Sequence, residues 1–334
     1  MDWSKGYSAT YYATVVHKGT WRDTDRIEIT GGTINRSPSG LRDSADIETT
    51  GYHETEQYIR IYLDTDQSGA FAHVPLFTGL ATTPERNING YHETNSIQCY
   101  SVLKAAEDVL LERGYYAPVD TDGGVIIQNL LSVIPAPVKV IGEAPKLKSA
   151  IIAESKENHR SMADKVLEAM GNWRMRIGGD GTIFVEEKPR TASAMLDPVG
   201  NDIIEPTINI KYDWYSAPNV LRAIDGDMVA VARDDDEDSP LSTVSRGREI
   251  WEEEKDCKLN TGESIAEYAI RRLGELQDVA LTASYDRRYI PDLAVGDLVR
   301  LAYPRQGLDG LFRITSQTVT LGYGAKTSEE VEKV

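Results

Sequence analysis

The chain has 334 residues, of which 40% are apolar and 27% are charged, and its formal net charge is −17. This length and composition predict a folded protein of two or three domains and argue against a disordered chain. Because a surface that binds nucleic acid needs basic residues to displace counterions from phosphates, the charge also argues against a specific nucleic-acid partner.

The first hundred residues predict short strands separated by turns. Residues 57–66 (QYIRIYLDTD) alternate strictly, with three aliphatic side chains on one face, which predicts a half-buried strand. The glycine pair at 31–32, which closes DRIEITGG, predicts a turn. Since further strands follow at intervals of roughly 8–12 residues, we interpret 1–104 as a barrel or sandwich.

The middle of the chain, residues 105–190, predicts a mixed α+β unit. The stretch 101–114 (SVLKAAEDVLLERG) contains good helix formers and ends in glycine, so it predicts a helix. A short helix is expected at 124–134, before a proline, and another in NHRSMADKVLEAMGN with Ser161 as its N-cap. The run WRMRIGGDGTIFVEE then predicts a hairpin with its turn at 178–181.

Residues 191–334 return to strands, with an acidic loop and a helix among them. The run DDDED at 234–238 predicts a solvated, self-repelling loop. Residues 261–277 predict the most regular helix of the chain. The first residue of this helix has two alternatives that differ by one turn, because capping-box spacing occurs both at Ser264 and at Asn260.

The last segment adds more strands. Two strands joined by a turn are expected in 285–304 (YDRRYIPDLAVGDLVRLAYP). In 311–321 the apolar face changes sides partway, which predicts a bulge or a crossing between sheets. The fold class indicated is α+β and rich in β-strands.

Metal sites are not indicated. The stretch 64–71 (DTDQSGAF) begins like a calcium-binding EF-hand loop, but Pro75 occupies the twelfth position, where a carboxylate is needed. The run 120–124 (DTDGG) fails in the same way, with Leu131 at that position. We therefore expect both stretches to be polar turns. The two cysteines have no CxxC spacing, so a zinc site is not expected either, and we predict no metal and no cofactor.

Nucleophilic catalysis is not indicated either. Ser101 and Lys104 have SxxK spacing, but the companion SDN and KTG motifs are missing from the sequence. Cys99 alternates with Ile97, which favours packing on a strand face over a reactive thiol. No HxxxH or HExxH spacing occurs among the five histidines, which are His17, His53, His73, His92 and His159.

Acidic residues leave two alternatives open. With 53 Asp and Glu residues, some carboxylates could meet in space, so a carboxylate-dependent cell-wall glycan hydrolase is one alternative. A carbohydrate-binding module for receptor recognition is the other. The run GGDG at 178–181 lacks the strand–turn–helix setting of a phosphate loop. We therefore expect no catalytic residues and a protein that is not an enzyme.

A resemblance to known proteins comes from the C-terminal segment. After the helix at 261–277, the pattern P-x-L-x-x-G-D-x-V precedes G-x-F-x-I, and the chain resembles the closing domain of phage tail hub proteins. These include the baseplate hubs of contractile phages and late-control-D-like tail proteins. The residues of the two patterns are Pro291, Leu293, Gly296, Asp297, Val299, Gly310, Phe312 and Ile314. The opening WRDTDRIEITGG is similar to the N-terminal domain of tail proteins from phages and prophages of Firmicutes.

The resemblance implies a particular architecture and set of partners. It implies two tube-like β-barrel domains, 1–104 and 191–334, with an α+β domain at 105–190. It further implies a homotrimer in the virion tail, made in the bacterial cytoplasm, that joins a hexameric tail tube to a tip or spike protein. DNA would pass through the lumen of this assembly. The negative charge of the chain predicts an acidic lining, to which DNA would not stick. No stretch approaches the ~20 apolar residues of a membrane helix and no signal-peptide core is present, so no membrane partner is expected.

Overall fold

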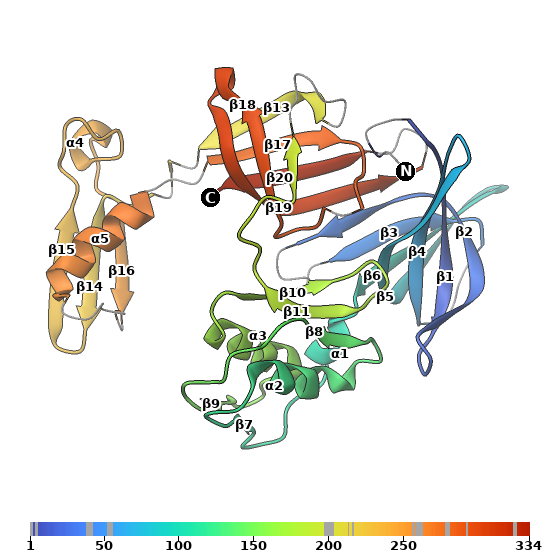
Figure 1. Cartoon of the computed structure of the whole chain (residues 1–334), viewed down its shortest axis with the longest axis horizontal. Coiled ribbons are helices and arrows are strands. Elements are labelled where there is room, and N and C mark those ends of the chain that lie inside the picture. The colour runs from blue at the N-terminus through green and yellow to red at the C-terminus, as the bar shows by residue number, and fades with distance from the viewer. Residues whose placement is uncertain are drawn as a thin grey trace. The chain divides into compact units, whose positions relative to one another are not determined.

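The computed structural model describes residues 3, 6–37, 43–51, 56–196, 204–212, 214–215, 217–255, 257, 263–277, 281–291, 293–322 and 326–334. These residues form two compact units. Unit 1 contains Met1–Ile208 and Ser284–Val331, and unit 2 contains Asn209–Ala283 and Glu332–Val334. Strands far outnumber helices, so the expected α+β, β-rich class is confirmed (Figure 1).

Six antiparallel strands build the N-terminal part of unit 1. They are β1 (Ser8–His17), β2 (Arg22–Arg36), β3 (Ser44–Thr49), β4 (Gln57–Gln67), β5 (Ala70–Asn89) and β6 (His92–Ser101). Each pairs with two others in the order β1-β4-β5-β6-β3-β2, and β2 pairs again with β1. The six pairings therefore run round a closed circuit. All six strands contribute to one apolar core, to which Ile34, Ile47 and Ile59 each contribute a fully buried side chain.

The C-terminal strands extend the same sheet. They are β12 (Ala194–Leu196), β13 (Ile204–Tyr212), β17 (Leu281–Arg287), β18 (Leu298–Tyr303), β19 (Leu308–Leu321) and β20 (Thr327–Lys333), with a 3₁₀ turn at Pro304–Gln306. The first half of β19 pairs with β18 and its second half pairs with β2. The change of apolar face predicted at 311–321 is thus confirmed as a crossing between strand partners (Figure 1).

A buried ion pair lies within these C-terminal strands. Arg287, from the RR of the YDRRY stretch, is fully buried and donates from Nε to Oε2 of Glu329 at 2.8 Å. Gln317 donates to the other carboxylate oxygen of Glu329 at 2.7 Å. Because a buried charge without a partner is strongly destabilising, these three side chains specify one register for β17, β19 and β20.

The α+β part of unit 1 packs on the outside of the strand circuit. Its elements are α1 (Lys104–Glu107), β7 (Tyr116–Ala117), α2 (Gly123–Leu130), a 3₁₀ turn (Leu131–Val133), β8 (Val138–Val140), β9 (Ile151–Ile152), α3 (His159–Ala169), β10 (Trp173–Ile177) and β11 (Ile183–Glu187). Strands β10 and β11 form the predicted hairpin, and β8 pairs with β11 in parallel. Its core includes Val16, Tyr58 and Leu80 of the strand circuit, so both parts share one apolar cluster.

This packing changes the predicted character of β4. The alternation at 57–66 predicted a half-buried strand, but both faces are buried. Ile59 and Ile61 are fully buried inside the circuit, while Tyr58 and Arg60 on the outer face are only 4% and 6% exposed. The prediction was wrong because the α+β part covers the face that the pattern assigned to solvent.

Two predicted boundaries are also corrected. The helix expected over 101–114 stops at Glu107, because the later backbone pairs with another segment instead: the Leu111 amide donates to Glu157 O, and the His159 amide donates to Val109 O. The N-cap of α3 is Asn158, whose side chain accepts from the backbone of Ser161, and not Ser161 itself.

The predicted turn at 31–32 is not a turn. Strand β2 continues through both glycines, with a bulge in its pairing to β3 at this point. Gly32 has φ +147°, and a Cβ there would lie 2.3 Å from the carbonyl oxygen of Asp46. The glycine therefore serves a close approach of two strands.

Unit 2 is a small sheet covered by a helix. It contains β14 (Val220–Asp225), β15 (Met228–Arg233), α4 (Thr243–Arg246), β16 (Trp251–Lys255) and α5 (Ile265–Gln277). Strand β14 lies centrally, antiparallel to β15 and parallel to β16. The Ser264 capping box is confirmed, because the Ser264 amide donates to Glu267 and the Glu267 amide to the Ser264 hydroxyl; Asn260 lies outside the described residues.

Two further predictions can be placed against this description. Among the helices that the structure describes, none has the length and apolar character to cross a membrane. The domain limits 1–104, 105–190 and 191–334 stay predictions. The two compact units have other limits, because residues 209–283 belong to unit 2 while the residues before 209 and those at 284–331 belong to unit 1.

Candidate functional site

The turn 178–181 connects the α+β part to the strand circuit. Its backbone touches β5 directly: the Thr78 hydroxyl donates to Gly179 O at 2.8 Å. A Cβ on Gly179 would lie 1.8 Å from the carbonyl oxygen of Pro75, so no other residue fits without displacement. The GGDG sequence is therefore a hairpin turn, as predicted, and its glycines allow the turn to dock on a neighbouring strand.

Two long side chains reach the same turn from the circuit. Trp21 Nε1 and Arg60 Nη2 each donate to the carbonyl oxygen of Asp180 at 3.0 Å. The guanidinium of Arg60 also pairs with Asp23 at 2.8 Å. These contacts fix the hairpin against β4 and β5 by directed hydrogen bonds as well as by apolar packing.

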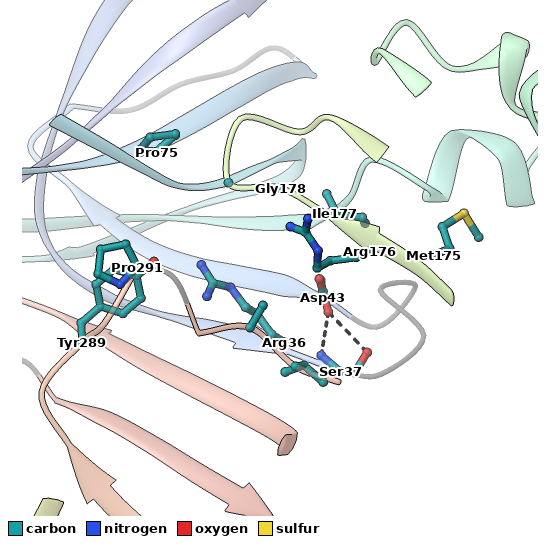
Figure 2. A pocket seen from close by; sticks show the side chains of 13 residues that line it. Arg36, Ser37, Asp43, Pro75, Met175, Arg176, Ile177, Gly178, Tyr289 and Pro291 are labelled. Atoms are coloured by element: carbon teal, nitrogen blue, oxygen red, sulfur yellow. Dashed lines mark hydrogen bonds between the residues drawn. The ribbon is translucent and has the colours of Figure 1, made fainter. Parts of the chain in front are cut away.

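A small cavity of about 80 Å³ lies beside this contact, where the end of β2, the β10–β11 hairpin and the segment 289–295 meet (Figure 2). Asp43 lines it and accepts a hydrogen bond from the Ser37 amide at 2.7 Å. Burial raises the pKa of Asp43 to about 6, although the Ser37 hydrogen bonds and the charge of Arg36 act in the opposite direction. Burial thus shifts the pKa of Asp43 towards neutral pH.

Arg36 also lines the cavity, but its guanidinium is bound to the protein. It donates to the side chain of Gln317 at 2.6 Å and to the carbonyl oxygen of Leu76 at 2.5 Å. The ring of Tyr289 lies 5.9 Å from the guanidinium. Arg36 thus ties β2 to β19 and to β5, which is a structural role.

The Gly-Asp pair of the C-terminal pattern has a second contact that the sequence did not indicate. As predicted, Gly296 and Asp297 form a turn before β18, and the Ala294 amide donates to Asp297 at 3.0 Å. Arg174 of β10 donates to Asp297 at 2.9 Å and to Glu186 at 2.8 Å. Gly296 has φ +88°, and a Cβ there would lie 2.8 Å from Arg174 Nη1. The motif therefore holds the α+β part as well as turning the chain.

The calcium-loop-like stretch forms a hairpin turn. Ser68 and Gly69 adopt positive φ between β4 and β5, as the turn prediction requires. The fold also brings Asp64 and His73 together across this hairpin, with 2.6 Å between Oδ1 and Nδ1. In the second such stretch Asp122 caps α2. Across the part of the chain that is described, no cluster of three or more His, Cys, Asp or Glu residues could hold a metal ion.

The residues considered for nucleophilic catalysis are occupied by structural contacts. The Ser101 hydroxyl accepts from the Leu103 amide, and the Lys104 amine pairs with Glu107 at 2.9 Å. Cys99 is fully buried, which raises the pKa of its thiol far above the usual range. His159 binds the carbonyl oxygen of Leu130.

The remaining histidines are also accounted for. His17 contacts its own turn, and His92 lies exposed at the start of β6. His53 is outside the described residues.

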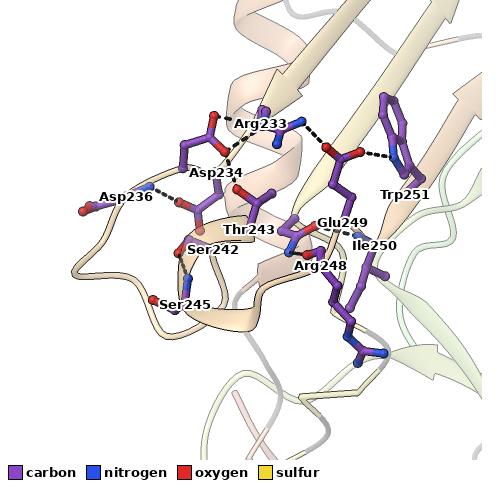
Figure 3. A network of polar contacts seen from close by, with 12 residues as sticks. Arg233, Asp234, Asp236, Ser242, Thr243, Ser245, Arg248, Glu249, Ile250 and Trp251 are labelled. Carbon is purple, nitrogen blue, oxygen red and sulfur yellow. Dashed lines mark hydrogen bonds and ion pairs between the residues drawn. The ribbon is translucent and has the colours of Figure 1, made fainter.

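The acidic run at 234–238 forms part of a polar network in unit 2 (Figure 3). Asp235 accepts from Arg233 at 2.7 Å and from the hydroxyl of Thr243. Arg233 also binds Glu249 at 2.5 Å, and Glu249 accepts from the Trp251 indole at 2.9 Å. The network joins the loop to the edge strands of the small sheet.

Comparisons with known proteins define the fold. No protein-family model and no curated protein matches the chain. The 43 kDa tail protein of prophage MuSo2 from Shewanella oneidensis is similar over 97% of both chains, with 13% identity and a TM-score of 0.67. The tail protein from Neisseria meningitidis MC58 is similar over 98% of this chain and 97% of its own, with 14% identity and a TM-score of 0.66.

A third similar structure comes from a secretion system. The E. coli c3393 protein is described as a component of the type VI secretion system with structural similarity to the T4 bacteriophage tail proteins gp27 and gp5. It matches over 92% of this chain and 74% of its own, with 10% identity and a TM-score of 0.52. The present chain therefore has the fold of phage and prophage tail proteins, and the resemblance predicted from its sequence is confirmed at the level of the fold.

Proposed function

We propose that the chain is a structural subunit of a phage or phage-like tail, placed at the tail tip or baseplate. The observation that carries this proposal is the likeness to two tail proteins, one of them from a prophage, over at least 97% of each chain. A likeness of this extent includes the strand circuit, the α+β part and the C-terminal strands together. In contrast, the motifs considered for catalysis are turns, caps and buried packing groups.

In this proposal three copies surround a hollow axis. They join a hexameric tail tube on one side to the tip or spike protein on the other. Each chain has two strand-rich parts, the β1–β6 circuit and the sheet around β17–β20, so a trimer offers six such parts to six tube subunits. A closed ring also removes the hazard of free strand edges. The net charge of −17 suits a lumen through which DNA slides.

Among the described residues, two carboxyl groups with a raised pKa bear on the hydrolase alternative. Burial raises the pKa of Asp164, which lines a pocket of about 530 Å³ with Glu168, but Asp164 is paired with Arg160 at 2.8 Å. Asp43 has the raised pKa that a general acid needs. Its cavity of about 80 Å³ is far below the roughly 300 Å³ at which ligand pockets begin. A sugar ring would not fit beside this carboxyl, which favours the structural role.

Light scattering coupled to size-exclusion chromatography tests the proposal. The expected mass is three times 37.0 kDa for the isolated chain, or that mass plus the mass of the bound tube protein after addition of the tail tube protein of the same phage. A chain that remains monomeric in both conditions would contradict it. Loss of turbidity from purified cell wall, abolished by Asp43→Asn, would support the hydrolase instead.

A further inference from the structure

The small sheet of unit 2 has one covered face and one open face. The side chains of Leu221 and Ala223 point to α5 and form a core with Leu273. By strand alternation, the neighbouring residues Arg222 and Ile224 point to the opposite face. The pairing registers place three residues from each strand on this face, in rows across the sheet: Val229–Ile224–Lys255, Val231–Arg222–Glu253 and Arg233–Val220–Trp251. Val220 is fully buried, so the open part of the face consists of the first two rows and the exposed side of Trp251.

The open face has the composition of a protein interface. Val229 and Val231 are 59% and 54% exposed, and Trp251 is 47% exposed. The Arg222 guanidinium lies 5.2 Å from the centre of the Trp251 ring. Trp and Arg are the residue types that carry most binding energy in interfaces, and exposed apolar side chains that gather on one face can mark a binding surface.

The topology of the sheet is compatible with a partner on this face. Strands β14 and β16 are parallel, whereas β14 and β15 are antiparallel. All-parallel sheets are almost always covered on both faces, while antiparallel sheets often leave one face in water, so this mixed sheet permits a second cover without requiring one. Helix α5 covers one face only, which leaves the other available to a partner (Figure 1).

Size and charge indicate what the cover is. Three strands ~4.8 Å apart, with five residues at ~3.3 Å each, give a face of roughly 250 Å². A stable dimer buries about 800 Å² on each partner, so this face is too small to hold a second copy by itself. The opposite face shows what fits, because α5 covers it with thirteen residues.

The charges on the face add a preference. Arg222 and Lys255 share one carboxylate, that of Glu253, at 3.2 Å and 3.4 Å. The corner around Lys255 therefore has one more cation than carboxylate, whereas at the other end of the face Arg233 is held by two carboxylates, those of Asp235 and Glu249. An acidic group on the partner would offset the positive charge at the Lys255 corner. We propose that the open face of unit 2 binds one amphipathic helix of a partner protein, with an apolar stripe over Val229 and Val231 and a carboxylate flank towards Lys255. This inference goes beyond the proposed tail role and does not depend on it.

Hydroxyl-radical footprinting of the isolated full chain is the first test. We expect Val231 and Trp251 to react at the same rate at all protein concentrations. Protection in the monomer would mean that the chain's own unit 1 covers the face. Protection that grows with concentration would mean that a second copy does. Either result would overturn the proposal.

Binding of a designed helix is the second test. The probe is an 18-residue amphipathic peptide with a leucine stripe flanked by glutamates, and its partner peptide carries lysines in place of the glutamates. We expect the glutamate peptide to bind the full chain more tightly than the lysine peptide. Val231→Asp should weaken binding at least about tenfold, the effect of losing ~1.4 kcal/mol.

The control variant is Ile270→Asp. Ile270 is 68% exposed on α5, in the same unit but on the other side of the sheet, so its replacement should leave binding unchanged. Equal losses in both variants, tighter binding of the lysine peptide, or no binding would each overturn the proposal. None of these results bears on the trimer mass, so the two proposals fail separately.

Discussion

Replacing Gly179 by alanine tests whether the hairpin turn must touch β5. The added Cβ would lie 1.8 Å from Pro75 O, and real contacts of this kind are essentially never below 3.0 Å, so the turn must move by at least about 1.2 Å. Such a shift breaks the hydrogen bonds from Thr78, Trp21 and Arg60 to the turn. At about 1 kcal/mol for each bond, the loss is about 3 kcal/mol, which is also the upper range for overpacking against a rigid neighbour.

Thermal unfolding followed by circular dichroism measures this loss. For a unit of this size, about 3 kcal/mol corresponds to a fall in Tm of roughly 6–12 °C. The matched control is Gly51→Ala, because a Cβ at Gly51 has no neighbour within 4 Å. If both variants melt at the same temperature, the close approach of the turn to β5 does not contribute to stability, and the reasoning is refuted.

Three more predictions concern stability. Asp43 binds its proton more tightly in the folded state than in the unfolded state, so its contribution to the free energy of unfolding is complete below pH 3.8 and is lost as the pH rises through about 6. Between pH 4 and pH 7 in urea titrations, the free energy of unfolding of the wild type should fall by up to about 3 kcal/mol more than that of Asp43→Asn. Parallel pH profiles of the two proteins would contradict this. Arg287→Met leaves the Glu329 carboxylate buried and uncompensated, which should cost about 3–5 kcal/mol, whereas the double variant with Glu329→Leu should recover more than half of it; no recovery would show that the pair is not coupled. Gly274→Ala, in the interior of α5 with open space around it, should stabilise unit 2 by about 1 kcal/mol in calorimetry, and a lower melting temperature would argue against the helix.

Short-range patterns predicted the local elements well. The hairpin at 173–187 and the Ser264 capping box depend on residues a few positions apart, and both occur as expected. The switch of apolar face in β19 also marked a real crossing. For the hairpin and the capping box the side chains that decide the structure are neighbours along the chain, and in β19 the local pattern indicated the crossing although its partner β2 is distant.

The N-cap of α3 was a local error, but the two larger errors arose where a distant segment decides. The helix expected over 101–114 ended early because its backbone pairs near Glu157, and β4 is buried on both faces because the α+β part lies over it. Periodicity describes one face of one element and contains no information about which element will cover the other face.

The features of the candidate site also fall into those that the sequence predicted and those that only the folded chain shows. The sequence by itself determined that the chain is acidic, strand-rich and without a catalytic signature, and its Gly296–Asp297 turn marked the resemblance to tail proteins. Only the tertiary structure brought Arg174 to Asp297, closed the cavity over Asp43 and left the face around Val231 open. These contacts join residues more than a hundred positions apart or separate strands of one sheet, and their free energy depends on burial and distance, which exist only once the chain has folded.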